Sequence, residues 1–440
     1  MQPLFYIVSL LAVACLYSCG TTGQGGLFNK KSPRDLYGQR LTDAGLHETA
    51  LGRAWFDAAA KSLASPLPIT LPYKEAGYFS AERAQATGFS FSAKRGQKIL
   101  ISLEKKPVSN FSIYLDLWRG AGDGNPPKHL AAADTGKTIL EYEIEDDLGY
   151  VLTLQPELLR GGEYTLTITA GPSIGFPLKR ANRNQVQSFW GVERDAGARK
   201  HEGVDIFSSF RTPVIAAADG MVSHVTINNL GGKVVFMRPS EKRYTLYYAH
   251  LDSQLVGDGQ LVKQGDTLGL MGNTGNAVNT PPHLHFGIYT NSGAVDPFPF
   301  IDPLIREPPA IGVPSSQLGK TARLNRKVTF STPAAEMTQP QELPVNTLLR
   351  LEAASGNRYT VTLPDGRTGY VAGSAITPGT AAIRKYNLKN AVPLFDRPDT
   401  SAARMSVLKA GDPVQVAGIF NTFEYVISGE LRGWIHRAAR

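Results

Sequence analysis

The stretch from His201 to Phe286 contains three short motifs: His201-Glu202-Gly203-Val204-Asp205, Tyr248-Ala249-His250-Leu251 and Pro282-His283-Leu284-His285-Phe286. These motifs hold four of the eight histidines of the 440-residue chain. A catalytic zinc site needs three protein ligands and one open position, and imidazole nitrogens with a carboxylate oxygen are suitable donors. The stretch supplies such a set with two histidines in excess. It therefore predicts a site for one zinc ion per chain.

The spacing within the motifs predicts their local structure. His283 and His285 are separated by one residue, so both side chains project from the same face if the segment is a β-strand. Gly203 and the β-branched residues after it favour a turn that leads into a strand, and they disfavour a helix. We therefore place His201 at the end of a loop and Asp205 on a strand. Glycine-rich runs around the motifs indicate a β fold with tight turns.

The segment from about Phe176 to Pro303, roughly a third of the chain, resembles the lysostaphin-type zinc endopeptidases. These are bacterial enzymes that cleave peptide bonds in peptidoglycan. The resemblance rests on several motifs, which are His201-x-Gly203-x-Asp205-Ile206, Thr212-Pro213-Val214, Ala218-Asp219-Gly220, Tyr248-Ala249-His250-Leu251, Gly265-Asp266, Gly272-x-Thr274-Gly275 and His283-Leu284-His285-Phe286.

The resemblance implies a role for each of five residues. His201, Asp205 and His285 would bind the zinc ion, and His250 and His283 would form the catalytic pair. Relatives that lose one or more of these residues act as binding regulators, so the presence of all five argues for an active enzyme. An activated water would attack the peptide while one imidazole takes its proton and the other stabilises the oxyanion or protonates the leaving amine. The sequence leaves open which histidine takes which role.

Four residues are further candidates for the surroundings of the site. Trp190 and Asn273 are candidates for lining the substrate groove, although packing in the core is an equal alternative for Trp190. Asn182 and Asn184 are candidates for an inhibitory ligand at the fourth zinc position, as upstream asparagines are in some similar enzymes.

A run of basic residues comes just before the first expected ligand. Arg194, Arg199 and Lys200 would either bind an acidic stem peptide or lie on solvated surface, which is the usual place of a charge run.

The first 19 residues are predicted to be a lipoprotein signal peptide. Their apolar run is shorter than a transmembrane helix of about 20 residues. The sequence Leu16-Tyr17-Ser18-Cys19-Gly20 resembles a lipobox, in which Cys19 is the lipidated residue. Because no Lys or Arg precedes the apolar run, a plain signal peptide is the alternative. The other cysteine, Cys15, also lies in the signal, so we expect a mature chain without a disulfide or a thiolate ligand.

The remaining pattern predicts a mainly β protein of several domains. Residues 20–64 are predicted to be a tether and a short helix that Asp43 caps, with Trp55 on its packed face. Alternating strands predict a β-sandwich accessory domain at residues 65–171. The antiparallel zinc peptidase domain is assigned to residues 172–304, and a linker to residues 305–325.

The C-terminal part contains an internal repeat at residues 326–378 and 381–440. Gly369-Tyr370-Val371 matches Gly433-Trp434-Ile435 at a shift of about 64 residues. Each unit is rich in strands and resembles the bacterial SH3-like barrels of wall enzymes. Such barrels would hold the peptidase domain against its polymer or pack on it and gate the cleft.

Two functions remain open from the sequence. The preferred one is a lipid-anchored zinc endopeptidase that cleaves the stem-peptide cross-links of peptidoglycan, in the cell envelope and with its anchor in the outer membrane facing the periplasm. The alternative is a noncatalytic wall-binding regulator that activates an amidase or a divisome partner. The net charge of +8 and the pI of about 9.3 fit an anionic wall polymer or membrane surface. Nucleic acid is excluded as a partner because the basic residues are scattered and the signal predicts export.

Overall fold

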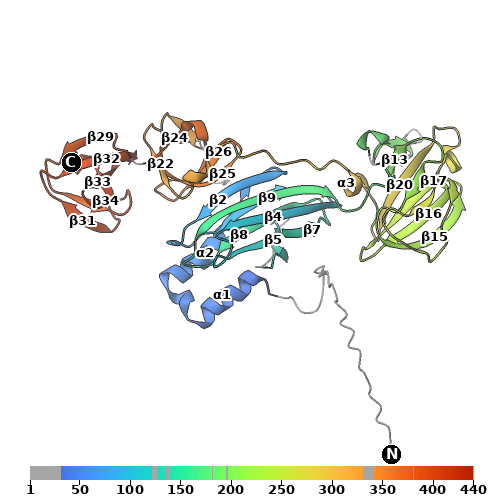
Figure 1. Cartoon of the computed structure of the whole chain (residues 1–440), viewed down its shortest axis with the longest axis horizontal. Helices are drawn as coiled ribbons and strands as arrows, with labels where there is room; N and C mark the ends of the chain where they lie inside the picture. Colours follow the sequence, from blue (N-terminus) through green and yellow to red (C-terminus); the bar gives the residue numbers. More distant parts are fainter. Residues whose placement is uncertain are drawn as a thin grey trace, which may run out of the picture. The chain divides into compact units, whose positions relative to one another are not determined.

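The computed structural model describes residues 31–120, 126–134, 139–180, 182–194, 197–330, 341–379 and 381–439, and its ribbon is shown in Figure 1. The predicted signal peptide, with Cys15 and Cys19, and the tether up to residue 30 lie outside the described residues. The predicted class is confirmed, because the described chain is mainly β. In this part of the chain, no helix is both long enough and apolar enough to cross a bilayer.

Two helices precede the strands, where the sequence analysis predicted one. The first, α1 (Pro33–Asp43), starts at Ser32, whose hydroxyl accepts a hydrogen bond from the backbone N–H of Asp35. Proline in the first turn and a serine N-cap are both strong start signals. The prediction that Asp43 caps a helix is wrong, since Asp43 ends α1. The predicted tether is likewise wrong from Pro33 onward, where α1 begins. The sequence did not indicate this helix because only two of its residues are buried, which leaves almost no apolar periodicity.

The second helix, α2 (Ala50–Ala64), is capped by Thr49, whose hydroxyl accepts from the backbone N–H of Gly52. Trp55 is fully buried, as expected for a packed face. Its indole N–H donates to the carbonyl of Pro156 at 2.9 Å. This bond connects α2 to the end of strand β8 (Gly149–Pro156).

Two sheets share one hydrophobic core between residues 67 and 172. The first sheet has the order β1-β3-β8-β5-β6, and the second contains the run β2-β9-β4-β7. Their strands are β1 (Leu67–Pro68), β2 (Tyr73–Phe79), β3 (Thr87–Ser92), β4 (Gln97–Lys106), β5 (Ile113–Arg119), β6 (Lys128–Ala132), β7 (Ile139–Glu143), β8 (Gly149–Pro156) and β9 (Gly162–Pro172).

Four of the five expected metal and catalytic residues lie in a ten-stranded antiparallel sheet with the main order β10-β13-β20-β17-β16-β15-β18, and His201 lies in the loop just before β13. The register places Asp205 on β13 opposite His285 on β20, and Ala249 on β17 opposite His285 from the other side. The elements are β10 (Val186–Ser188), β13 (Val204–Phe207), β14 (Pro213–Ile215), β15 (Gly220–Asn228), β16 (Gly232–Pro239), β17 (Tyr244–Gln254), β18 (Leu261–Val262), β19 (Thr267–Met271), β20 (His283–Thr290), β21 (Gly293–Val295) and α3 (Phe298–Ile301).

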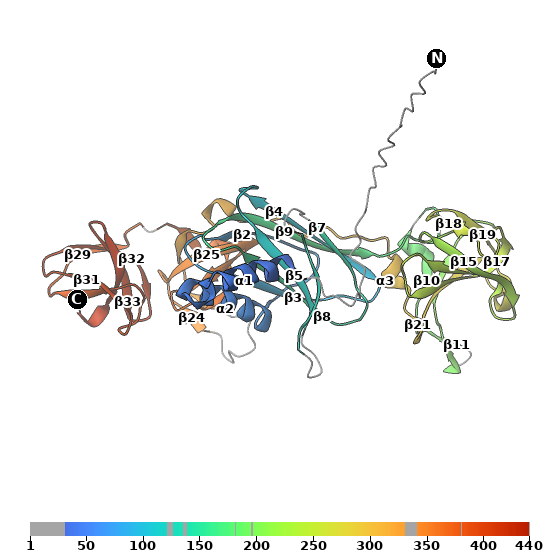
Figure 2. The ribbon, with the colours of Figure 1, turned by 90° about the horizontal axis from the view of Figure 1, so that it is seen from below.

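A separate two-stranded ladder precedes β13. It pairs β11 (Glu193–Arg194) with β12 (Arg199–Lys200), so that Arg194 lies opposite Arg199. Figure 2 labels β11 below β21. The chain from β12 leads directly to His201.

The C-terminal residues form two groups of strands. In the first group β25, β26 and β27 are consecutive antiparallel neighbours, and in the second β32, β33 and β34 are. The strands are β22 (Thr321–Leu324), β23 (Val328–Phe330), β24 (Gln341–Leu343), β25 (Leu348–Ser355), β26 (Arg358–Thr362), β27 (Thr368–Ala372), β28 (Ile376–Pro378), β29 (Arg384–Asn387), β30 (Val392–Phe395), β31 (Arg404–Leu408), β32 (Pro413–Phe420), β33 (Phe423–Ser428) and β34 (Leu431–His436). Strand β22 lies within the predicted linker.

Candidate metal and catalytic site

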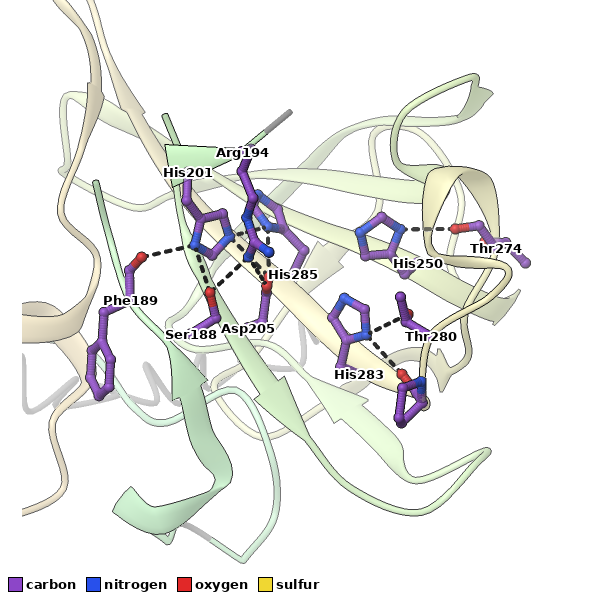
Figure 3. A network of polar contacts seen from close by, with 11 residues as sticks. Ser188, Phe189, Arg194, His201, Asp205, His250, Thr274, Thr280, His283 and His285 are labelled. Atoms are coloured by element: carbon purple, nitrogen blue, oxygen red, sulfur yellow. Dashed lines mark hydrogen bonds and ion pairs between the residues drawn. The ribbon is translucent and has the colours of Figure 1, made fainter. Parts of the chain in front are cut away.

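Three side chains converge on one point of the large sheet. His201 Nε2, Asp205 Oδ1 and His285 Nδ1 lie 3.0 Å from one another in all three pairs, as Figure 3 shows. Among the described residues, these two histidines and one aspartate form a cluster that offers a metal three ligand atoms. Two imidazole nitrogens and one carboxylate oxygen form a donor set that suits zinc. The residues present therefore fit the expected ion.

Glycine at position 203 allows this convergence. A Cβ atom built on Gly203 would lie 2.7 Å from both Cε1 and Nε2 of His285, which is closer than two carbon atoms can approach without displacement. The imidazole of His285 therefore packs directly against the backbone of the loop that carries His201. In the sequence motif His-x-Gly-x-Asp, the position between the two ligands must therefore have no side chain.

The pKa shifts of two expected ligands, Asp205 and His285, suit a cation. Burial alone would raise the pKa of Asp205, but the two imidazole rings whose nitrogens lie 3.0 Å from its Oδ1 hold that pKa well below its usual range. Burial lowers the pKa of His285. A carboxylate and a neutral imidazole are the forms that bind metal.

Backbone carbonyl groups orient three of the four histidines. His201 Nδ1 lies 2.9 Å from the carbonyl oxygen of Phe189, His250 Nδ1 lies 2.8 Å from that of Thr274, and His283 Nδ1 lies 2.9 Å from that of Pro281. Each Nδ1 therefore carries the hydrogen and donates it. The lone pair of each ring is consequently on Nε2.

His250 and His283 lie side by side next to the ligand set. Their ring centroids are 4.9 Å apart, and the His250 ring lies 5.9 Å from that of His285 (Figure 3). Burial lowers the pKa of His250 to about 4, so the ring is neutral at neutral pH and its Nε2 carries a lone pair. The backbone of His250 is in the left-handed region, with φ of 63°, and its N–H donates to Gly231 at 2.7 Å. Strain of this kind is typical of functional sites.

Two residues contact the site in ways that the sequence analysis missed. The ring of Phe207 stacks on that of His283, with centroids 4.9 Å apart and planes at 24°. Arg194 Nη2 lies 2.7 Å from Asp205 Oδ2 and also 2.7 Å from Ser188 Oγ. The strand period could have indicated Phe207, which lies two residues after Asp205. Sequence spacing gave no signal for the contact of Arg194.

The other candidate residues make local contacts in the structure. The side chain of Asn182 accepts from the backbone N–H of Asn184 at 3.0 Å and so caps the turn Arg183–Gln185. Asn273 donates to the carbonyl groups of Val278 and Thr280 in the loop before His283. Trp190 is half-buried. Their roles as inhibitory ligands and groove residues remain predictions.

A sheet that presents His, Asp and His beside two further histidines indicates a metallopeptidase. The family model described as Peptidase family M23 matches residues 199–297. An uncharacterized metalloprotease of Haemophilus influenzae is 45% identical over 100 residues, which is 22% of this chain and 20% of the relative. The L-Ala–D-Glu endopeptidase of Bacillus subtilis is 35% identical over 138 residues, 29% of this chain and 42% of the relative.

Two further comparisons concern enzymes named for peptidoglycan or for lysostaphin. The peptidoglycan DD-endopeptidase ShyC of Vibrio cholerae is 39% identical over 103 residues, 22% of this chain and 23% of the relative. The solved catalytic domain of lysostaphin from Staphylococcus simulans is 32% identical, with 27% of this chain and 94% of that chain covered and a TM-score of 0.25. The chain spans less than half the length of these curated relatives. The residues that match the family model, 199–297, include all five candidate metal and catalytic residues.

Proposed function

We propose that the protein is a zinc-dependent endopeptidase that hydrolyses the peptide cross-links of bacterial peptidoglycan. The observation that carries the proposal is the meeting of three ligand atoms at 3.0 Å with two oriented histidines beside them. The relatives named as an L-Ala–D-Glu endopeptidase and as a peptidoglycan DD-endopeptidase support the choice of substrate.

In this proposal His201, Asp205 and His285 hold the zinc ion. When bound, zinc supplies Lewis-acid chemistry, because it polarises a carbonyl group and lowers the pKa of water to about 7. His250 and His283 move the protons. Each has its Nδ1–H fixed on a carbonyl oxygen, so Nε2 accepts the proton of the attacking water or returns one to the leaving amine. The two rings are close enough to divide these tasks between them.

We also propose that Cys19 carries a lipid anchor and that the protein acts in the cell envelope, on the periplasmic side of the outer membrane. The C-terminal repeats, as SH3-like units, would bring the peptidase domain to the wall. These proposals rest on the signal and the repeat in the sequence.

The test is to incubate zinc-loaded residues 20–440 with isolated peptidoglycan and to identify the released fragments by mass spectrometry. We expect cross-linked dimers to disappear and monomers to accumulate, and a His283→Ala variant to leave the dimers intact. The masses of the new termini identify the bond. If the zinc-loaded protein leaves every cross-link intact but stimulates a purified wall amidase, the noncatalytic regulator is the correct function.

A further inference from the structure

Asp205 uses its two carboxylate oxygens for different partners. Oδ1 lies 3.0 Å from His201 Nε2 and from His285 Nδ1, on the side where the ligand atoms converge. Oδ2 accepts a hydrogen bond from Arg194 at 2.7 Å. The carboxylate is therefore held at both oxygens (Figure 3).

The guanidinium group of Arg194 is itself held in place. The same nitrogen donates to Ser188 Oγ at 2.7 Å, and Ser188 Oγ lies 3.3 Å from His201 Nδ1. Ser188 on β10 is paired with Asp205 on β13, at a point where the register of the two strands shifts. Through one nitrogen atom, Arg194 thus connects the β11–β12 ladder to Ser188 on β10 and to Asp205 on β13. Ser188 in turn lies next to a second expected ligand, His201.

Burial makes this contact more than a surface ion pair. Only 8% of the Asp205 side chain is exposed, against 39% for Arg194. Without the guanidinium group, Oδ2 would be an unpaired buried carboxylate oxygen, and the carboxylate would be free to rotate about its χ2 bond. Rotation exchanges the oxygen that faces the ligand set.

We propose that Arg194 is a positioning residue of the metal centre, which fixes the Asp205 carboxylate with Oδ1 directed to the ion. This inference rests on the proposed zinc binding, and it assigns a function to a residue for which the sequence left open either a contact with an acidic stem peptide or a place on solvated surface. Partners of this kind, one shell beyond the ligands, typically affect metal affinity or activity 10–100-fold.

The test measures zinc affinity by competition with a chromogenic chelator, on residues 20–440. We expect Arg194→Ala to bind zinc about 10–100-fold more weakly than the wild type. Arg194→Lys should restore part of the loss, because an ammonium group keeps the charge but lacks the planar fork of donors. The matched control is Arg199→Ala, which removes an exposed arginine from the opposite position of the same ladder and should keep the affinity of the wild type.

A spectroscopic measurement separates positioning from a general loss of structure. With Co²⁺ in place of zinc, the visible absorption of the Arg194→Ala variant should change from that of the wild type, while its far-ultraviolet circular dichroism stays the same. If Arg194→Ala does not fold, the comparison of Arg194→Lys with the wild type provides the same test, since lysine keeps the charge but lacks the planar fork of donors.

The outcomes distinguish this inference from the function on which it rests. Wild-type protein that binds no zinc overturns both. Wild-type protein that binds zinc tightly, with an Arg194→Ala variant of equal affinity and unchanged cobalt spectrum, overturns the positioning role alone. If Arg194→Ala keeps its zinc affinity and cobalt spectrum but has a raised KM, Arg194 contacts the substrate instead.

Discussion

At the scale of single residues, Gly203 makes the sharpest steric prediction. A methyl group there would lie 2.7 Å from the imidazole of His285 and 2.7 Å from the backbone oxygen of Phe286, so Gly203→Ala must displace an expected ligand or the strand that carries it. We expect zinc affinity to fall at least about tenfold, in the range for a perturbed metal shell. Chelator competition measures the change. The control is Gly257→Ala, because a Cβ atom at Gly257 would meet no atom within 4 Å, and equal affinities of the two variants would refute the steric argument.

Glu75 provides a prediction about pH, away from the metal site. It is 1% exposed, and the hydroxyl groups of Tyr73 and Tyr164 donate to its two oxygens at 2.7 Å. Burial raises its pKa from 4.5 to about 7, although both hydroxyl groups lower it. The folded state therefore binds the proton more tightly than the unfolded state. Its stabilising contribution is complete below pH 4.5 and is lost as the pH rises through 7.

The comparison with Glu75→Gln isolates this effect. The shift corresponds to about 3 kcal/mol at most, and the amide of the variant does not titrate. We expect the melting temperature of the wild type to fall more than that of the variant between pH 5 and pH 8. Parallel pH profiles of the two proteins would mean that Glu75 has an ordinary pKa in the fold.

Sequence could predict the site residues that act through their chemical type, but not those that act through contact. His201, Asp205 and His285 were identified because few residue types bind zinc and their spacing resembles a known family. The contact of Arg194 with Asp205 depends on how the β11–β12 ladder lies against β10, which the sequence does not encode locally. The same reason explains why Arg194 could not be distinguished from Arg199 and Lys200.

At the scale of elements, the pairing of β13 with β20 sets the geometry around His283. Phe207 lies opposite His283 in the ladder, and the two rings stack. We expect Phe207→Leu to lower kcat about three- to tenfold, because the imidazole loses a flat surface that restricts its rotation. Zinc affinity should stay unchanged, since Phe207 contacts no expected ligand among its described ring contacts. Hydrolysis rates and chelator competition on the same preparation measure kcat and zinc affinity. A loss of both would mean that Phe207 supports the metal ligands instead.

The helices before the first sheet show where pattern analysis fails at this scale. The strands follow apolar alternation, and the sequence predicted them because one buried face repeats every second residue. Helix α1 buries only Gly38 and Leu41, so no apolar stripe marks it. Its cap residues mark it instead, and Ser32-Pro33 would have been the correct signal.

At the scale of the whole molecule, one sheet crosses the boundary that the sequence analysis placed between two domains. Strand β2 pairs with β25 of the first repeat, through Ala76 opposite Ala354 and Gly77 opposite Ala353. The combined sheet has nine strands. The sequence could predict both groups of strands as β, but the pairing joins residues more than 270 positions apart, and no local pattern specifies such a partner.

This shared sheet predicts that the first repeat and the residue 67–172 sheets unfold together. Glu352 on β25 pairs with Arg83 at 2.6 Å, across the junction, and with Arg350 on its own strand. Its side chain is 14% exposed and that of Arg83 is 30% exposed, so we expect Glu352→Ala to cost about 1 kcal/mol. Differential scanning calorimetry should show the whole joint transition at a lower temperature. The control is Glu342→Ala, which removes an exposed ion pair with Lys327 within the first repeat. A transition of the first repeat that shifts alone, while that of the residue 67–172 sheets stays in place, would mean that the β2–β25 pairing does not couple them.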